Sequence, residues 1–213
     1  MIYYDIHTHQ PSVHVEDIAI VNTIIKEDCE LSLPPVYCSV GIHPWYIYNV
    51  REQLSCLESI ISASNVVAIG EAGLDKLAET PLAIQQDVFL KQAALAEEKS
   101  KPLIIHCVKA WTELIAARKM VKPQTPWIIH GFRGNGELAQ QLILQGFYLS
   151  FGEYFNPSAL QSARLDRIFA ETDDKEIDIQ AVYRQIASSL HLSLEELASG
   201  LENNVHNIFS IGY

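Results

Sequence analysis

The feature that most constrains the fold of this chain is a regular alternation of two sequence patterns. Short runs of apolar and β-branched residues alternate with longer segments of helical periodicity. This alternation is typical of βα units, which build a parallel sheet covered by helices. We expect strands at residues 2–7, 17–23, 36–41, 66–71, 103–107, 127–131, 147–151 and 167–172.

Helical patterns separate most of these strands, at residues 48–62, 82–99, 110–120, 136–145, 157–166, 178–190 and 193–209. Eight strands in this order predict one domain over residues 1–213, an α/β protein with a TIM-type (β/α)8 barrel. The first two connections are irregular, because residues 9–17 are too few for a crossover helix and Pro34-Pro35 end any helix in the second. We therefore expect a distorted barrel whose first crossover helices are shortened or missing. A homodimer partner or the C-terminal helix would cover the flank left bare.

Composition narrows the classes of function. Hydrophobic residues make up 48% of the chain, which excludes general disorder, and the formal net charge is −11. Such a charge argues against a general nucleic-acid coat but not against a nuclease, since bound divalent cations reverse the local field. The four cysteines form no CxxC pair, and no apolar run is long enough to cross a bilayer. Together with the absence of a signal-peptide pattern, this predicts a cytoplasmic protein with reduced thiols and no membrane association.

Polar residues stand at the ends of the expected strands. His7 and His9 follow the first apolar run and, being two apart on a strand, point the same way, with Asp5 behind them. The other strand-end residues of this kind are His43, Glu71, His106, His130 and Asp173. In a barrel of parallel strands the carboxyl ends meet at one rim, where active sites lie.

The residue types indicate metal chemistry. Divalent ions such as zinc take imidazole nitrogen and carboxylate oxygen, so four histidines and two carboxylates are enough for two ions. Two such ions polarise a phosphoryl oxygen and lower the pKa of a shared water toward neutrality. Each residue alone also has an ordinary structural explanation, for example a hydrogen-bonded buried histidine for His106 or His130. The shared rim and fixed order favour the metal site.

The order of the motifs D-x-H-x-H, G-x-H-P, G-E-x-G-L-D, I-H, H-G-F-x-G, S-F-G and E-T-D resembles the TatD family of metal-dependent deoxyribonucleases. This resemblance implies a TIM-barrel fold and roles for the matching residues. His7, His9 and Asp173 would hold one ion, His106 and His130 the second, and Glu71 would bridge them. Asp173 would also assist the attacking water, His43 would contact substrate, and Asp5 would hydrogen-bond a ligand or a neighbouring amide.

The chain departs from the family pattern on the loops that would grip substrate. Trp45 replaces the usual histidine after G-x-H-P, Lys175 stands where E-T-D-x-P has proline, and the loop that normally follows is missing. The usual arginine and acid after the fifth strand are also absent. Two basic residues could compensate, namely Lys109 after that strand and Arg133, where the family more often has a small residue. We hypothesise that either holds a substrate phosphate.

The sequence therefore predicts a hydrolase of phosphodiester bonds that uses two divalent ions, with zinc favoured and magnesium or manganese as alternatives. Its partner would be DNA or a phosphorylated small molecule. Two further hypotheses stay open. One is a metallo-hydrolase acting on another ester, a phosphomonoester, a lactone or an amide. The other is a barrel that keeps its metal but has lost turnover and serves as a scaffold.

Overall fold

A computed structural model describes residues 1–27, 29 and 31–211 and contains every expected strand. The strands are β1 (Tyr4–Thr8), β2 (Ile18–Ile24), β3 (Cys38–Gly41), β4 (Val66–Asp75), β5 (Leu103–Val108), β6 (Trp127–Ile129), β7 (Tyr148–Phe151) and β8 (Ile168–Ala170). They follow one another in chain order in the sheet. The pairs β1–β2, β3–β4, β4–β5, β6–β7 and β7–β8 are parallel.

The expected helices are also present among the described residues. They are α1 (Val50–Ile60), α2 (Leu82–Lys99), α3 (Trp111–Val121), α4 (Gly136–Leu144), α5 (Pro157–Ser162), α6 (Ile179–Leu190) and α7 (Leu194–Ile208). Short 3-10 helices follow β3 (η1, Pro44–Tyr46) and precede β8 (η2, Leu165–Arg167). Within the described residues no α-helix joins β1 to β2 or β2 to β3. This confirms the predicted (β/α)8 order of elements and its irregular first connections.

The chain divides into two compact units. The first unit combines Met1–Val21 with Ile128–Tyr213, and the second is the continuous stretch Asn22–Trp127. The single domain inferred from the sequence stays a prediction.

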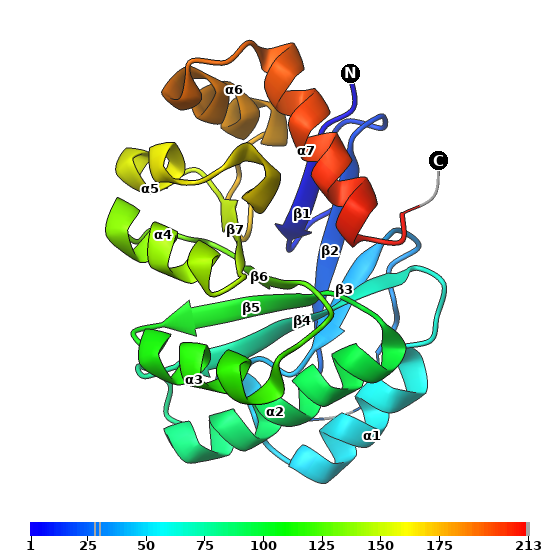
Figure 1. Ribbon diagram of the computed structural model, residues 1–213. Helices are drawn as coiled ribbons and strands as arrows, with labels where there is room; N and C mark the ends of the chain where they lie inside the picture. Colours follow the sequence, from blue (N-terminus) through cyan, green and yellow to red (C-terminus); the bar gives the residue numbers. More distant parts are fainter. Residues whose placement is uncertain (28, 30, 212–213) are drawn as a thin grey trace. The chain divides into compact units, whose positions relative to one another are not determined.

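The second unit is built on β3, β4 and β5. All residues of β4 are buried, as expected for a strand covered on both faces. The register pairs Gly73 of β4 with His106 of β5. A side chain at Gly73 would collide with the His106 carbonyl, so glycine permits this close approach. Figure 1 shows α1, α2 and α3 on one side of these strands.

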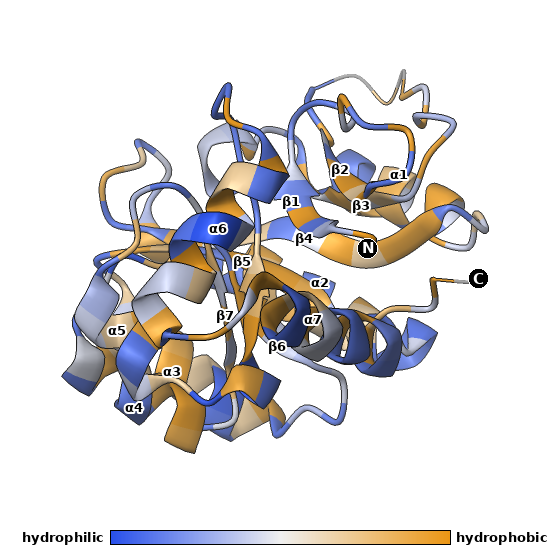
Figure 2. Ribbon diagram, turned by 90° about the horizontal axis from the view of Figure 1, so that it is seen from above, coloured by the Kyte–Doolittle hydropathy of each residue, from blue (hydrophilic) through white to orange (hydrophobic). Residues whose placement is uncertain are grey.

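In the first unit the C-terminal helix α7 lies beside β1 (Figure 1). Its apolar side chains Leu197, Leu201 and Val205 are buried, and Figure 2 shows hydrophilic and hydrophobic residues alternating along the helix. The Tyr4 hydroxyl donates a 3.2 Å hydrogen bond to Glu202 Oε1, which fastens β1 to the helix. The C-terminal helix therefore covers β1, one of the two solutions expected for the bare flank.

The cysteines differ from the sequence expectation. Cys29 and Cys56 form a disulfide with their Cα atoms 5.8 Å apart, whereas Cys38 and Cys107 are free thiols. The expectation of four reduced thiols rested on motif spacing, which cannot show that the chain after β2 returns to α1. That expectation is wrong for this pair in the structure.

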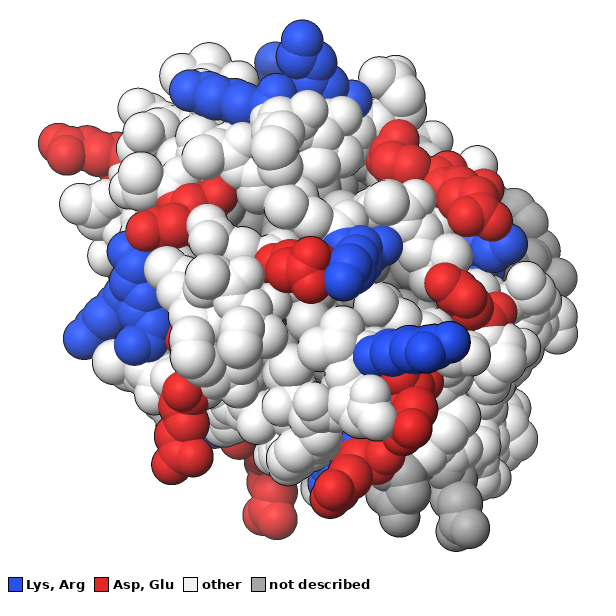
Figure 3. Space-filling view, turned by 90° about the horizontal axis from the view of Figure 1, so that it is seen from below, with Lys and Arg blue, Asp and Glu red and all other residues white. Residues whose placement is uncertain are grey.

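On the face drawn in Figure 3, acidic and basic side chains are interspersed. None of the helices formed by the described residues has the length and apolarity required to cross a membrane.

Candidate metal centre

In the first unit, the end of β1 and the segment after β8 bring two histidines to one carboxylate. The Nε2 atoms of His7 and His9 each lie 3.6 Å from Asp173 Oδ1. Backbone hydrogen bonds hold the two segments together, because Asp173 N donates to the His7 carbonyl at 2.9 Å and His9 N to the Asp173 carbonyl at 3.0 Å. Ligand atoms of the three residues lie within 4.8 Å of one another, a spacing that suits one metal ion.

The charge state of Asp173 follows from these neighbours. Burial alone would raise the pKa of its carboxyl group. The imidazoles of His7 and His9, whose Nε2 atoms face its Oδ1, and the nearby charge of His130 instead hold that pKa well below its ordinary value. Asp173 is therefore an anion, as a metal ligand must be.

Asp5 fixes the two segments that carry His7 and Asp173 through hydrogen bonds. Its Oδ1 accepts hydrogen bonds from the backbone amides of His7 (3.2 Å) and Thr172 (3.1 Å), and its Oδ2 accepts one from Thr172 Oγ1 at 2.6 Å. Burial raises the pKa of Asp5 to about 7, although the bonds from Thr172 oppose the shift. Asp5 thus joins a neighbouring amide, as expected, and ties β1 to the residue before Asp173.

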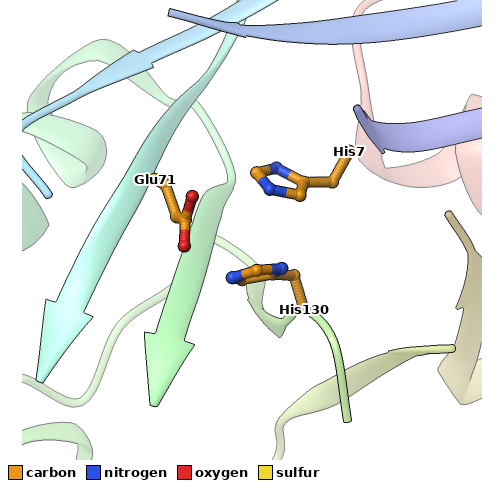
Figure 4. A group of neighbouring side chains, drawn as sticks. All are labelled: His7, Glu71 and His130. Carbon is orange, nitrogen blue, oxygen red and sulfur yellow. The ribbon is translucent and has the colours of Figure 1, made fainter. Parts of the chain in front are cut away.

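His130 and Glu171 form a further imidazole–carboxylate contact in the first unit. The His130 ring centre lies 4.2 Å from that of His7, and Figure 4 draws the two rings next to each other. His130 Nδ1 is 3.5 Å from Glu171 Oε1, which also accepts a 2.6 Å bond from the Gly131 amide. Glu171 is fully buried, and its Oε2 has no hydrogen-bond partner among the described residues. A buried carboxylate oxygen left in this way is costly unless a cation meets it.

In the second unit, Glu71 projects from β4 (Figure 4) and is 4% exposed. Its Oε1 lies 3.2 Å from His43 Nε2 and 2.9 Å from His106 Nδ1. Asn22 fixes the other side, because its Nδ2 donates to Glu71 Oε2 at 3.2 Å and its Oδ1 accepts from the Glu71 amide at 2.9 Å. His43, Glu71 and His106 form a second group whose ligand atoms would suit a metal ion.

A further carboxylate, Asp75, lies on the opposite side of His106. Its Oδ2 is 3.0 Å from His106 Nε2 and accepts a 2.7 Å hydrogen bond from Trp45 Nε1. Its Oδ1 accepts a 2.7 Å bond from the Leu77 amide. Burial would raise the pKa of Asp75, but the bonds from His106, Leu77 and Trp45 lower it.

The predicted ligands thus fall into two groups. His7, His9, His130 and Asp173 belong to the first unit, and Glu71 and His106 to the second. Sequence reasoning singled out none of Glu171, Asp75, Asn22 and Trp45 as site residues. The motifs E-T-D and G-E-x-G-L-D contain the two acids and were the available signal for them.

The predicted substrate residues lie at the surface. Arg133 is exposed, and its guanidinium carbon is 5.6 Å from the centre of the Tyr154 ring. It lines a small pocket of the first unit together with Asp173 and Lys175. Lys109, directly after β5, is exposed. Their role in substrate binding stays a prediction.

The donor set fits divalent metal ions. Imidazole nitrogens and carboxylate oxygens are the ligands that zinc and manganese take in proteins. Each unit brings such atoms within 4.8 Å of one another, mostly on buried or half-buried side chains. The unsatisfied oxygen of Glu171 is the kind of atom that a cation would neutralise. Fold and site together define a (β/α)8 protein with metal-binding groups at its strand ends.

Comparisons with known proteins assign this fold and these motifs to a family. A family model described as TatD related DNase matches residues 8–210, and the chain belongs to that family. It is similar to the uncharacterized metal-dependent hydrolase YabD of Bacillus subtilis, with 30% identity over 202 residues covering 83% of this chain and 78% of YabD.

Solved structures give the same fold. The crystal structure of YjjV, a TatD homologue from Escherichia coli K12, matches with a TM-score of 0.84 and 22% identity, covering 99% of this chain and 98% of that one. A TatD family hydrolase from Entamoeba histolytica matches with a TM-score of 0.77 and 19% identity, covering 98% of each chain. The predicted TIM-type fold class is therefore confirmed.

Proposed function

We propose that this protein is a metal-dependent hydrolase that cleaves phosphodiester bonds in the manner of a TatD-type deoxyribonuclease. The observation that carries the proposal is the gathering of buried imidazole and carboxylate groups at the strand ends of both units. Membership of a family described as TatD related DNase supports it, as do relatives named metal-dependent hydrolases.

In this proposal six side chains hold two divalent ions, with zinc favoured and magnesium or manganese as alternatives. His7, His9 and Asp173 would hold one ion, His106 and His130 would hold the other, and Glu71 would serve both. When bound, such a pair would supply an activated water and stabilise negative charge on a phosphoryl oxygen. Asp173 would orient that water and accept its proton, and His43 would contact the substrate.

The substrate would be DNA or a phosphorylated small molecule. The formal net charge of −11 and the interspersed charges of Figure 3 offer no broad basic field for a long duplex. Phosphate recognition would therefore be local, through Arg133 and Lys109. This surface favours short or single-stranded substrates, or a small phosphodiester, over tightly bound duplex DNA. A homodimer and a cytoplasmic location stay predictions.

The test combines metal analysis with hydrolysis assays. Purified protein should contain or take up two equivalents of zinc or manganese. With metal added, it should release nucleotides from single-stranded DNA and hydrolyse bis(4-nitrophenyl) phosphate. Replacing Glu71 by Gln or His130 by Ala should lower kcat by about two orders of magnitude or more, because each removes a metal ligand.

His191→Asn is the matched control, since His191 is an exposed residue at the end of α6 with a left-handed backbone that asparagine tolerates. It should leave both activities unchanged. Turnover of bis(4-nitrophenyl) phosphate without DNA cleavage would replace the nuclease by a phosphodiesterase that acts on small substrates. Full metal occupancy without turnover of either would leave only a metal-binding scaffold.

A further inference from the structure

The imidazole of His106 lies between two carboxylates of the second unit. Its Nδ1 is 2.9 Å from Glu71 Oε1, and its Nε2 is 3.0 Å from Asp75 Oδ2. The two ring nitrogens therefore face different partners. Only one nitrogen of a neutral imidazole carries the proton, so the partners decide which nitrogen has a free lone pair.

Asp75 is held more rigidly than a surface carboxylate. The residue is 1% exposed. Its Oδ1 accepts from the Leu77 amide at 2.7 Å. Its own backbone is clamped by Gln85, whose Oε1 accepts from the Asp75 amide at 2.7 Å and whose Nε2 donates to the Asp75 carbonyl at 2.9 Å. Asp75 cannot swing away from His106 without breaking these bonds.

Trp45 supplies the remaining bond to this carboxylate. Its indole Nε1 donates to Asp75 Oδ2 at 2.7 Å, the same oxygen that faces His106. Although Trp45 is 56% exposed, its ring makes edge contacts with the rings of His43 and His106, with centroids 5.1 Å and 5.9 Å apart. Its backbone amide donates to His43 Nδ1 at 3.1 Å, so the short segment after β3 contacts His43 as well as Asp75.

We propose that Asp75 and Trp45 are positioning residues that keep the His106 proton on Nε2 and present Nδ1 to a divalent ion shared with Glu71. This inference rests on the proposed function, which makes His106 a metal ligand. Both facing carboxylates can only accept, so the ion decides between the two nitrogens: bound beside Glu71, it would take the Nδ1 lone pair and leave the proton on Nε2, where Asp75 accepts it. The hydrogen bond from Trp45 Nε1 fixes the position of Asp75 Oδ2, the oxygen that accepts from His106. Carboxylates that orient ligand histidines in this way change metal affinity by about 10- to 100-fold.

Two substitutions separate the parts of this arrangement. Asp75→Asn leaves one oxygen where Leu77, Trp45 and His106 all need an acceptor, and its amide nitrogen would force Nε2 to accept and Nδ1 to carry the proton. Trp45→Phe keeps an aromatic ring but removes the N–H donor. We expect the zinc dissociation constant of the weaker-binding site to rise about 10- to 100-fold in D75N and severalfold in W45F.

The affinities are measured by competition with a chromophoric chelator, and the ligating nitrogen by NMR of protein loaded with ¹¹³Cd and labelled with ¹⁵N-histidine. The wild type should show coupling between cadmium and His106 Nδ1. In D75N that coupling should be lost or weakened. In W45F kcat should fall with KM unchanged. Asp87→Asn, which changes an exposed acid of α2 paired with Lys91, is the matched control and should change none of these values.

The outcomes are distinct. Cadmium coupling to Nε2 of His106, or wild-type zinc affinity in both D75N and W45F, would overturn this inference while leaving the metal-dependent hydrolase intact. A wild-type protein that binds no divalent ion would overturn the proposed function and this inference with it. Because Trp45 is largely exposed, W45F tests the inference even if D75N does not fold.

Discussion

Asp5 shows how a single side chain can fix a site to which it contributes no ligand. It accepts three hydrogen bonds, two from backbone amides on opposite sides of the His7–Asp173 pair and one from Thr172 Oγ1. Asp5 and Thr172 are 167 positions apart in the chain. The Asp5 carboxylate therefore adds side-chain bonds to the backbone hydrogen bonds that hold the His7 and Asp173 segments together.

Replacing Asp5 by Ala should lower the free energy of unfolding by about 2–3 kcal/mol, because buried donors of His7 and Thr172 lose their acceptor. Asp5→Asn should cost less, since its amide oxygen still accepts from both amides. Urea denaturation followed by circular dichroism measures both. Asp166→Ala serves as control, because Asp166 forms an exposed ion pair with Arg164. Equal stability of D5A and the control would contradict this account.

At this scale the sequence predicted the residue types of the site but not their partners. Histidines and acids after apolar runs are visible in one dimension, because strand ends share a rim. The bond from Trp45 to Asp75 depends on a rotamer and on how η1 turns after β3. Asn22 reaches Glu71 from 49 residues away, and neither residue type nor spacing signals that contact.

Among the helices, α7 begins with the clearest sequence signal. Ser193 and Glu196 form a capping box, in which the Ser193 hydroxyl accepts from the Glu196 amide and the Glu196 carboxylate accepts from the Ser193 amide. These bonds satisfy backbone N–H groups that the first turn of a helix would otherwise leave without a hydrogen-bond partner. Since α7 packs beside β1, its first turn also supports the strand that carries His7.

Ser193→Ala should lower the free energy of unfolding by about 1 kcal/mol.

Glu196→Gln tests the carboxylate of this capping box through the pH dependence of stability. Hydrogen bonds from Ser193 lower the pKa of Glu196 in the folded protein. The resulting stability is present above the ordinary pKa of glutamate and is lost as pH falls through the lowered value. The stability of the wild type should therefore exceed that of E196Q at pH 7 and equal it near pH 3. A pH-independent difference in thermal stability would contradict this.

The order and type of the elements could be predicted from the sequence, whereas several of their ends could not. The expected strand at 66–71 continues to Asp75, since Gly73 lets β4 and β5 stay paired past Glu71. The expected strands at 127–131 and 167–172 are shorter in the structure and end at Ile129 and Ala170, directly before His130 and Glu171. The polar residues that signal the site are the ones that end these strands.

For the molecule as a whole, the disulfide between Cys29 and Cys56 is a constraint that the sequence did not predict. It closes a loop with a sequence separation of 27 within the second unit and joins the segment after β2 to α1. In the chain-entropy description, such a loop stabilises the folded state by about 3 kcal/mol. A reducing compartment would remove this contribution.

Cys56→Ser should therefore lower the free energy of unfolding by up to about 3 kcal/mol under oxidising conditions. With dithiothreitol present, wild type and C56S should unfold at nearly the same urea concentration. Thiol counting with Ellman's reagent in denaturant reports whether the bond has formed. Four reactive thiols in protein purified without reductant would contradict the disulfide.

The first unit is assembled from the two ends of the polypeptide, with the second unit between them. Because a ribosome delivers residues in order, β1 with His7, and His9 directly after it, emerge more than a hundred residues before the strands that complete their unit. The continuous middle stretch can collapse as soon as it is made. We expect a late closing step, in which the segment that carries β1 waits for the stretch that begins at Ile128.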